Sequence, residues 1–190
     1  MGFFRSLRRG KQFGGYIKYF DLEKWYADLT ERQRALLRRV EPEIETHDIS
    51  YTSQTAGEFI SHCATAVAEF DVGFAEQLFT KALNLERNPV KRHFALMTLA
   101  TFYRRQAKNA ENWHKVVRED IELMPAFARE WVKEYDELPG YPAVEDMLRV
   151  LRAWGDLPEA IALCKRAQKL GIAGNWEEQI VDLQQRMQDN

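Results

Sequence analysis

The sequence has few of the residues that mark disulfide-bonded, disordered or membrane-spanning proteins. Its 190 residues include two cysteines, Cys63 and Cys164, which lie far apart in helical patterns, so we expect no disulfide framework. The six prolines and ten glycines form no tract rich in glycine and serine, which argues against a long disordered linker. No apolar run approaches the ~20 residues of a membrane-spanning helix, and no segment resembles the core of a signal peptide. These absences predict a cytoplasmic protein.

Patterns that would place catalytic groups, metals or cofactors are also missing. The four histidines, His47, His62, His93 and His114, stand in none of the spacings that chelate a metal ion. There is no glycine-rich loop to hold a phosphate, and the carboxylates fall in expected loops and on polar helix faces. The sequence therefore predicts no catalytic residue, no metal site and no cofactor. An enzyme with an unfamiliar site is left as the third alternative.

Charge divides the chain unevenly. The net charge of −2 gives no general reason to expect nucleic acid or acidic ligands. However, the segment before the first acidic residue, Asp21, is basic and aromatic, and the rest of the chain is net acidic. We expect three parts, namely a basic arm at residues 1–20, short helices and an acidic loop at residues 21–54, and one helical-repeat region at residues 55–190 that ends in a capping helix.

Apolar residues recur with helical periodicity in every patterned segment, and no segment shows the sustained alternation of a strand. Capping boxes of Thr30 with Gln33 and of Thr55 with Glu58 mark two helix starts. We therefore predict an all-α fold with at least eight helices, mostly antiparallel neighbours joined by short loops. The longer expected helices span residues 56–70, 74–86, 90–106, 110–123, 126–137, 142–154, 157–170 and 175–188.

The stretch from Trp154 to Gly171 carries the clearest packing pattern. Asp156 is a suitable N-cap and Gly171 a suitable helix end. Between them one helical stripe holds Ala160, Ile161, Cys164, Ala167 and Leu170. The same spacing recurs at Ala75, Phe79, Ala82 and Leu85. A stripe that occurs twice in one chain indicates repeated, closely packed helix pairs, and we expect the five tryptophans to pack within or between them.

This pattern resembles the tetratricopeptide repeat over roughly residues 56–171. The residues that match the family's second helix and its turn glycine are Ala75, Phe79, Ala82, Gly155, Ala160 and Ala167. Trp113 and Asp120 stand where the family would have alanines. The resemblance implies antiparallel helix pairs stacked as a tetratricopeptide-like α-solenoid, with an irregular helical bundle as the other form of this fold class.

The resemblance also implies a function. In that family the first helix of each pair lines a concave groove that binds a protein or peptide. The positions that would face such a groove are Thr98, Phe102, Arg105, Glu145, Arg149 and Arg152. An exposed Phe102 flanked by arginines would suit an acidic or C-terminal peptide, because a guanidinium group pairs with a carboxylate through two hydrogen bonds. We therefore expect a non-catalytic protein-interaction scaffold.

The basic arm offers an alternative function. It combines apolar and basic residues that could share a short interfacial helix, namely Phe3, Phe4, Arg5, Leu7, Arg8 and Arg9. The opening residues Met1 to Ser6 also fit the pattern for N-myristoylation. An adaptor that docks on an anionic membrane through this arm is therefore the second hypothesis. Nucleic acid is a weaker candidate, because the rest of the chain has no sustained basic stripe.

Overall fold

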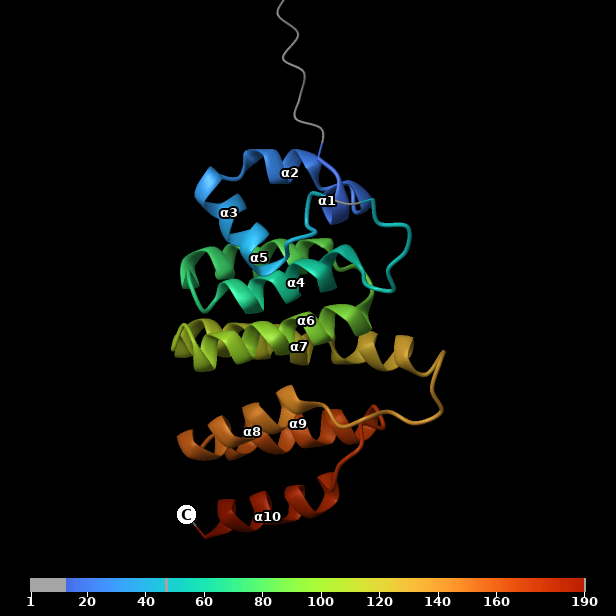
Figure 1. Ribbon diagram of the computed structural model, residues 1–190. Coiled ribbons are helices and arrows are strands. Elements are labelled where there is room, and N and C mark those ends of the chain that lie inside the picture. The colour runs from blue at the N-terminus through green and yellow to red at the C-terminus, as the bar shows by residue number, and fades with distance from the viewer. Residues whose placement is uncertain (1–12, 47, 190) are drawn as a thin grey trace, which may run out of the picture. The chain divides into compact units, whose positions relative to one another are not determined.

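The computed structural model describes residues 13–46 and 48–189, and all regular structure in this part of the chain is helical (Figure 1). Ten helices are present there, which confirms the predicted all-α fold. They are α1 (Gly15–Tyr19), α2 (Glu23–Asp28), α3 (Glu31–Val40), α4 (Ala56–Val67), α5 (Val72–Leu85), α6 (Pro89–Arg105), α7 (Ala110–Trp131), α8 (Pro142–Trp154), α9 (Leu157–Lys169) and α10 (Trp176–Gln188). Among these helices, none has the length and apolar content needed to cross a membrane.

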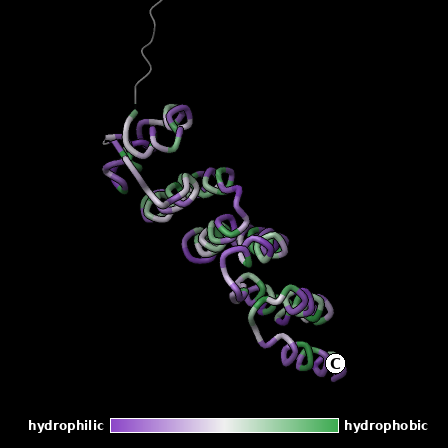
Figure 2. The backbone as a smooth tube through the Cα atoms, turned by 90° about the vertical axis from the view of Figure 1, so that its right-hand side faces the viewer, coloured by the Kyte–Doolittle hydropathy of each residue, from purple (hydrophilic) through white to green (hydrophobic). Residues whose placement is uncertain are grey.

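The chain forms two compact units that divide after Lys81, within α5. The first unit holds α1 to α4 and most of α5, and the second holds the end of α5 and α6 to α10. This division differs from the boundary after residue 54 that the composition suggests, because α3 and α4 pack against each other across the intervening loop. In both units apolar and polar residues alternate along the turns of the helices (Figure 2), as expected for helices that bury one face.

The first unit begins its longer helices as the sequence predicts. Thr30 and Gln33 form a complete capping box at the start of α3, and Thr55 and Glu58 form another at the start of α4. Each box supplies acceptors to backbone N–H groups that have no partner within the helix. The local pattern alone therefore fixes where these two helices start.

Residues 13–20, the described end of the expected basic arm, are built into the first unit. The Gly14 and Ile17 N–H groups donate to the carbonyl oxygens of Glu45 and Ile44, at 3.1 and 3.0 Å. Gly15 has φ of +55°, and a Cβ atom there would clash with the backbone carbonyl oxygens of Glu43 and Ile44. This position accepts glycine alone, because the backbone conformation and the close approach both exclude a side chain.

The second unit begins with an antiparallel pair, α6 and α7. Arg92 near the start of α6 pairs with Glu119, at 2.5 Å, while Tyr103 near the end of α6 and Trp113 near the start of α7 line one common pocket. Asn88 caps α6 and Asn109 caps α7 through their side-chain oxygens. The large apolar side chain of Phe94 on α6 is 47% exposed, whereas the adjacent His93 is buried against Asp120 of α7.

Helix α7 continues through Pro125, whereas the sequence predicted a stop there and a separate helix at residues 126–137. Proline leaves the carbonyl of Ile121 without its helical donor, which usually ends or bends a helix. Here the buried stripe runs past the proline, since Met124, Phe127 and Ala128 all lie in the core. Burial of these side chains outweighs the loss of one backbone hydrogen bond.

The second unit closes with α8, α9 and α10. Gly155 ends α8 in the left-handed conformation, with φ of +76°, and the Asp156 side chain then caps α9. The predicted packing stripe is confirmed, because Ala160, Cys164 and Ala167 have no exposed surface, and the matching Ala75 and Ala82 have none either. Helix α10 packs on α9 and buries Trp176 and Leu183. Its other residues are mostly exposed.

Replacing Gly15 by alanine should destabilise the protein by about 2–4 kcal/mol, because a left-handed residue gains a Cβ atom that meets backbone oxygens. Urea unfolding followed by circular dichroism measures this change. Gly73→Ala is the matched control, since a Cβ atom at Gly73 meets only the Asp71 carboxylate, at 3.7 Å. The control should be neutral or slightly stabilising. Equal effects of the two substitutions would contradict the close approach at Gly15.

Enlarging Ala160 to leucine should cost about 1–3 kcal/mol, since its side chain is fully buried at a close helix contact. Ala162 lies two residues further along α9 and is exposed. Ala162→Leu should therefore change the free energy of unfolding by less than about 0.5 kcal/mol. Thermal unfolding of both variants provides the comparison, and an Ala160→Leu protein as stable as the wild type would place this stripe on the surface.

Candidate binding cleft

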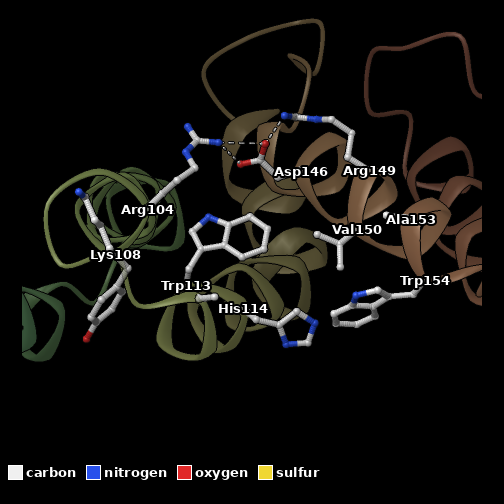
Figure 3. A pocket seen from close by; sticks show the side chains of 11 residues that line it. Arg104, Lys108, Trp113, His114, Asp146, Arg149, Val150, Ala153 and Trp154 are labelled. Atoms are coloured by element: carbon white, nitrogen blue, oxygen red, sulfur yellow. Dashed lines mark hydrogen bonds and ion pairs between the residues drawn. The ribbon is translucent and has the colours of Figure 1, made fainter.

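A cleft of about 590 Å³ opens in the second unit between the α6–α7 turn region and α8. We call it the tryptophan cleft. Its lining residues are Tyr103, Arg104, Lys108, Ala110, Trp113, His114, Asp146, Arg149, Val150, Ala153 and Trp154. Figure 3 shows that they converge from three helices, so the cleft depends on how the two helix pairs pack and is not formed by any single segment.

Aromatic and aliphatic side chains form one part of the tryptophan cleft. Trp154, in the last turn of α8, is 64% exposed and lies near the His114 ring, with 5.3 Å between the ring centroids. The sequence had placed this tryptophan with the packing residues, and that expectation is wrong for Trp154. It is the last residue of α8, and the two residues that follow it, Gly155 and Asp156, are also exposed. An exposed tryptophan in a concave site offers a large apolar contact to a partner.

Charged side chains form the other part. The Arg104 guanidinium lies 3.4 Å from an Asp146 carboxylate oxygen, and Arg149 bonds to the same carboxylate. Asp146 is largely covered, with 17% of its side chain exposed, whereas the Arg104 and Arg149 side chains are 45% and 69% exposed. The carboxylate therefore holds two arginines whose outer surfaces face solvent. Together with Lys108, the cleft is lined by three basic side chains and one carboxylate.

Lys108 has an unusual backbone conformation. It lies in the turn between α6 and α7 with φ of +49°, and the Asn109 N–H donates to the Tyr103 carbonyl, at 2.9 Å, across it. Glycine adopts this left-handed conformation most readily, because it has no Cβ atom. A lysine there costs roughly 1 kcal/mol of conformational energy. Backbone strain of this kind often accompanies a functional site, and this lysine lines the cleft.

Two further groups complete the electrostatics of the cleft. The Trp113 indole N–H is buried and has no hydrogen-bond acceptor. The His114 Nε2 atom accepts a hydrogen bond from Arg118 Nε, at 3.3 Å. Burial, followed by the nearby positive charge of Arg118, lowers the pKa of His114 below its ordinary value. His114 is therefore neutral near pH 7, and the part of the cleft beside Trp154 carries no charge from it.

The structure brings only one of the predicted groove residues into the tryptophan cleft, namely Arg149. Phe102 is 2% exposed and packs beside Tyr103, so the prediction that its ring faces a partner is wrong. Arg105 is exposed but does not line the cleft, whereas its neighbour Arg104 does. Adjacent residues on a helix point ~100° apart. A prediction that shifts the exposed face of α6 by one residue therefore selects Arg105 in place of Arg104.

The other predicted groove residues lie elsewhere. Arg152 donates to the Gln179 side chain of α10, at 2.9 Å, and Gln179 in turn lies 3.5 Å from Glu145. These two residues of α8 therefore engage the last helix. The Thr98 hydroxyl donates to the Phe94 carbonyl of its own helix, at 2.9 Å. The arm residues Phe3, Phe4, Arg5, Arg8 and Arg9 lie outside the described residues, as does His47.

The sequence analysis did not identify Lys108, Trp113 and Trp154 as contact residues of the cleft. It also did not identify a buried polar cluster next to the cleft. His93 Nδ1 lies 2.8 Å from an Asp120 carboxylate oxygen, and the Tyr141 hydroxyl donates to the same carboxylate, at 2.8 Å. The exposed fractions of the three residues are at most 2%. The one signal of this cluster in the sequence is Asp120, which stands where the tetratricopeptide family would have an alanine. Burial and the adjacent carboxylate raise the pKa of Tyr141, so its hydroxyl stays protonated and donates.

The remaining reactive groups of the described chain are shielded. Burial raises the pKa of the Cys63 thiol to about 12 and also raises the pKa of Cys164. Both thiols are buried and unbridged, so little of the nucleophilic thiolate forms near neutral pH. Within residues 13–46 and 48–189, no group of three or more histidine, cysteine, aspartate or glutamate side chains is placed to hold a metal ion.

Comparison with known proteins gives one relative. The chain is 26% identical over 192 residues to an uncharacterized protein of Aquifex aeolicus (strain VF5), a match that covers 93% of this chain and 94% of the other. No family model and no solved structure matches the chain.

Removing the Asp120 carboxylate should destabilise the second unit strongly. Asp120→Ala leaves the buried His93 and Tyr141 side chains without their shared acceptor, at an expected cost of about 2–4 kcal/mol. Asp120→Asn keeps an acceptor oxygen and should cost less. The neighbouring Glu119 makes an exposed pair with Arg92, so Glu119→Ala should cost under about 1 kcal/mol. Urea unfolding of the three variants tests this order, and similar costs for Asp120→Ala and Glu119→Ala would contradict it.

Proposed function

We propose that this protein is a non-catalytic interaction scaffold that binds a segment of another protein in the tryptophan cleft. The observation that carries the proposal is the exposed Trp154 beside Val150, Ala153 and two salt-bridged arginines in one concave site. Protein-interaction sites are enriched in tryptophan and arginine, because both give large contacts that become fully desolvated when a partner binds.

The size of the cleft supports a ligand of several side chains. Ligand sites commonly enclose ~300–1,000 Å³, and the tryptophan cleft, at about 590 Å³, falls in this range. Its walls belong to two consecutive helix pairs, so a bound segment would contact both α7 and α8. A site of this kind suits an extended or helical peptide that lies across the helices.

The proposal includes a tetratricopeptide-like organisation of the second unit. Two antiparallel helix pairs followed by a single amphipathic helix are what a short repeat array needs in order to end in water. The buried alanines of the packing stripe and the left-handed Gly155 agree with the residues that carry the resemblance. The continuous 22-residue α7 departs from a regular array. The membrane-binding role of the arm and the cytoplasmic location stay predictions from the sequence.

Site-specific photo-crosslinking in the source organism tests the proposal. A benzophenone amino acid at Ala153, which is exposed in the cleft, should form a covalent adduct with a partner protein. The control position is Ala173, which is exposed in the loop before α10. Adducts at Ala153 that are absent at Ala173 support the cleft as the binding site. Equal labelling at both positions would count against it.

Once a partner is known, the contribution of Trp154 can be measured directly. Trp154→Ala should weaken binding roughly 30-fold, the effect expected when a central aromatic contact is lost. Val132→Ala removes another exposed apolar side chain, 53% exposed, outside the cleft, and should leave the affinity unchanged. Isothermal titration calorimetry distinguishes the two. Binding that needs residues 1–12 but not Trp154 would favour the arm instead.

A further inference from the structure

We infer that the tryptophan cleft recognises an acidic side chain of the partner that stands close to a large apolar one. This inference rests on the proposed function and specifies the chemistry of the bound segment. It follows from the separation of polar and apolar groups in the cleft, because Arg104, Asp146 and Arg149 lie on one side of Trp113 and Val150, and His114 and Trp154 lie on the other (Figure 3).

The polar end has more donors than acceptors. Each guanidinium group carries five N–H donors, and the single Asp146 carboxylate can occupy only part of those of Arg104 and Arg149. The Asp146 carboxylate lies between the two guanidinium groups (Figure 3) and bonds to both, while much of each arginine stays exposed. A second carboxylate that approaches from solvent would find two fixed, charge-assisted donors.

The Trp113 indole N–H adds a third unsatisfied donor. It is buried without an acceptor, and in Figure 3 the indole nitrogen lies on the side of the ring that faces Arg104 and Asp146. A buried donor without a partner lowers stability, so its presence needs an explanation. A ligand oxygen at the polar end would satisfy it, once a neighbouring side chain turns aside.

Lys108 gives independent support. A glycine at its left-handed position would relieve backbone strain, yet the chain has a lysine there, and this lysine lines the same cleft. A positive charge at this position is useful if the ligand is an anion. The strained lysine and the unsatisfied tryptophan thus point to the same kind of ligand from separate observations.

The surroundings favour a single carboxylate over a polyanion. Asp146 already places one carboxylate within the cleft, and the exposed Glu111 directly follows the lining residue Ala110 in the first turn of α7. Nucleic acid brings a phosphate with every nucleotide, and its successive charges would meet these carboxylates. A peptide with one or two acidic residues avoids this repulsion. Its neighbouring apolar side chain would then reach Val150, Ala153 and Trp154 at the uncharged end.

The test is a selection of random peptides on the purified full-length chain. We expect enriched peptides to contain aspartate or glutamate within a few residues of tryptophan, phenylalanine or leucine. Affinities of fluorescein-labelled peptides, measured by fluorescence anisotropy, should fall about 10-fold or more for Arg149→Glu and for Arg104→Glu. Arg105→Glu is the matched control, since it makes the same charge change one position along α6, outside the cleft, and should change affinity less than about 2-fold.

Two conservative variants separate recognition from a merely structural role. Trp113→Phe keeps an aromatic ring but removes the unsatisfied donor, and Lys108→Gly removes the charge and the strain. Each should raise the thermal midpoint of the free protein and lower its affinity for the acidic peptides. A lower thermal midpoint with unchanged affinity would overturn the roles assigned to these two residues.

The outcomes also distinguish this inference from the proposed function. Peptides that lack acidic residues, and that still lose binding with Trp154→Ala, would overturn the inference and leave the scaffold proposal standing. Peptide affinity that is unchanged in both the Trp154→Ala and the Arg149→Glu variants would overturn the inference and the scaffold proposal together. A labelled single-stranded oligonucleotide serves as the competing probe, and tighter binding of it than of any peptide would also overturn both.

Discussion

The arrangement of the second unit depends on one buried carboxylate. Asp120 of α7 bonds to His93 of α6 and to Tyr141, which directly precedes α8, so a single side chain connects three helices. A carboxylate removed from water is costly unless donors surround it, and here the donors come from both neighbouring helices. These helices also line the tryptophan cleft. The spacing of the cleft walls therefore follows from a polar contact in the core that the cleft itself does not include.

A second aspartate, Asp146, lies at the surface and orients side chains of the cleft. Asp146 bonds to both Arg104 and Arg149, and both arginines keep a large exposed surface. Exposed ion pairs of this kind add little to stability, commonly under ~1 kcal/mol. These ion pairs contribute to binding instead, because side chains that are already ordered lose less conformational entropy when a partner binds. The two aspartates thus serve the same cleft in different ways, one by setting the helix spacing and one by orienting donors.

Features that lower the stability of the free protein gather at this cleft. Lys108 occupies a conformation that favours glycine, the Trp113 N–H lacks an acceptor, and Trp154 leaves most of its surface in water. Each of these features lowers the free energy of unfolding relative to a residue chosen for stability alone. Proteins retain such features where they serve binding, and the rest of the fold compensates. Here the compensation is visible in the fully buried alanine stripe of α9 and in the core beneath Pro125.

The helical fold, and where several helices begin and end, follow from local sequence pattern. The capping boxes at Thr30 and Thr55, the left-handed Gly155 and the stripe at Ala160 depend on contacts within a turn or two of helix, so local pattern was sufficient. Three features could not be read from local pattern, namely that α7 runs through Pro125, that Phe102 is buried, and that Arg104 instead of Arg105 lines the cleft with Arg149. These outcomes depend on which face of each helix the next pair covers. Helical periodicity identifies an apolar face, but the packing of distant residues decides which side chains at its edges are left in water.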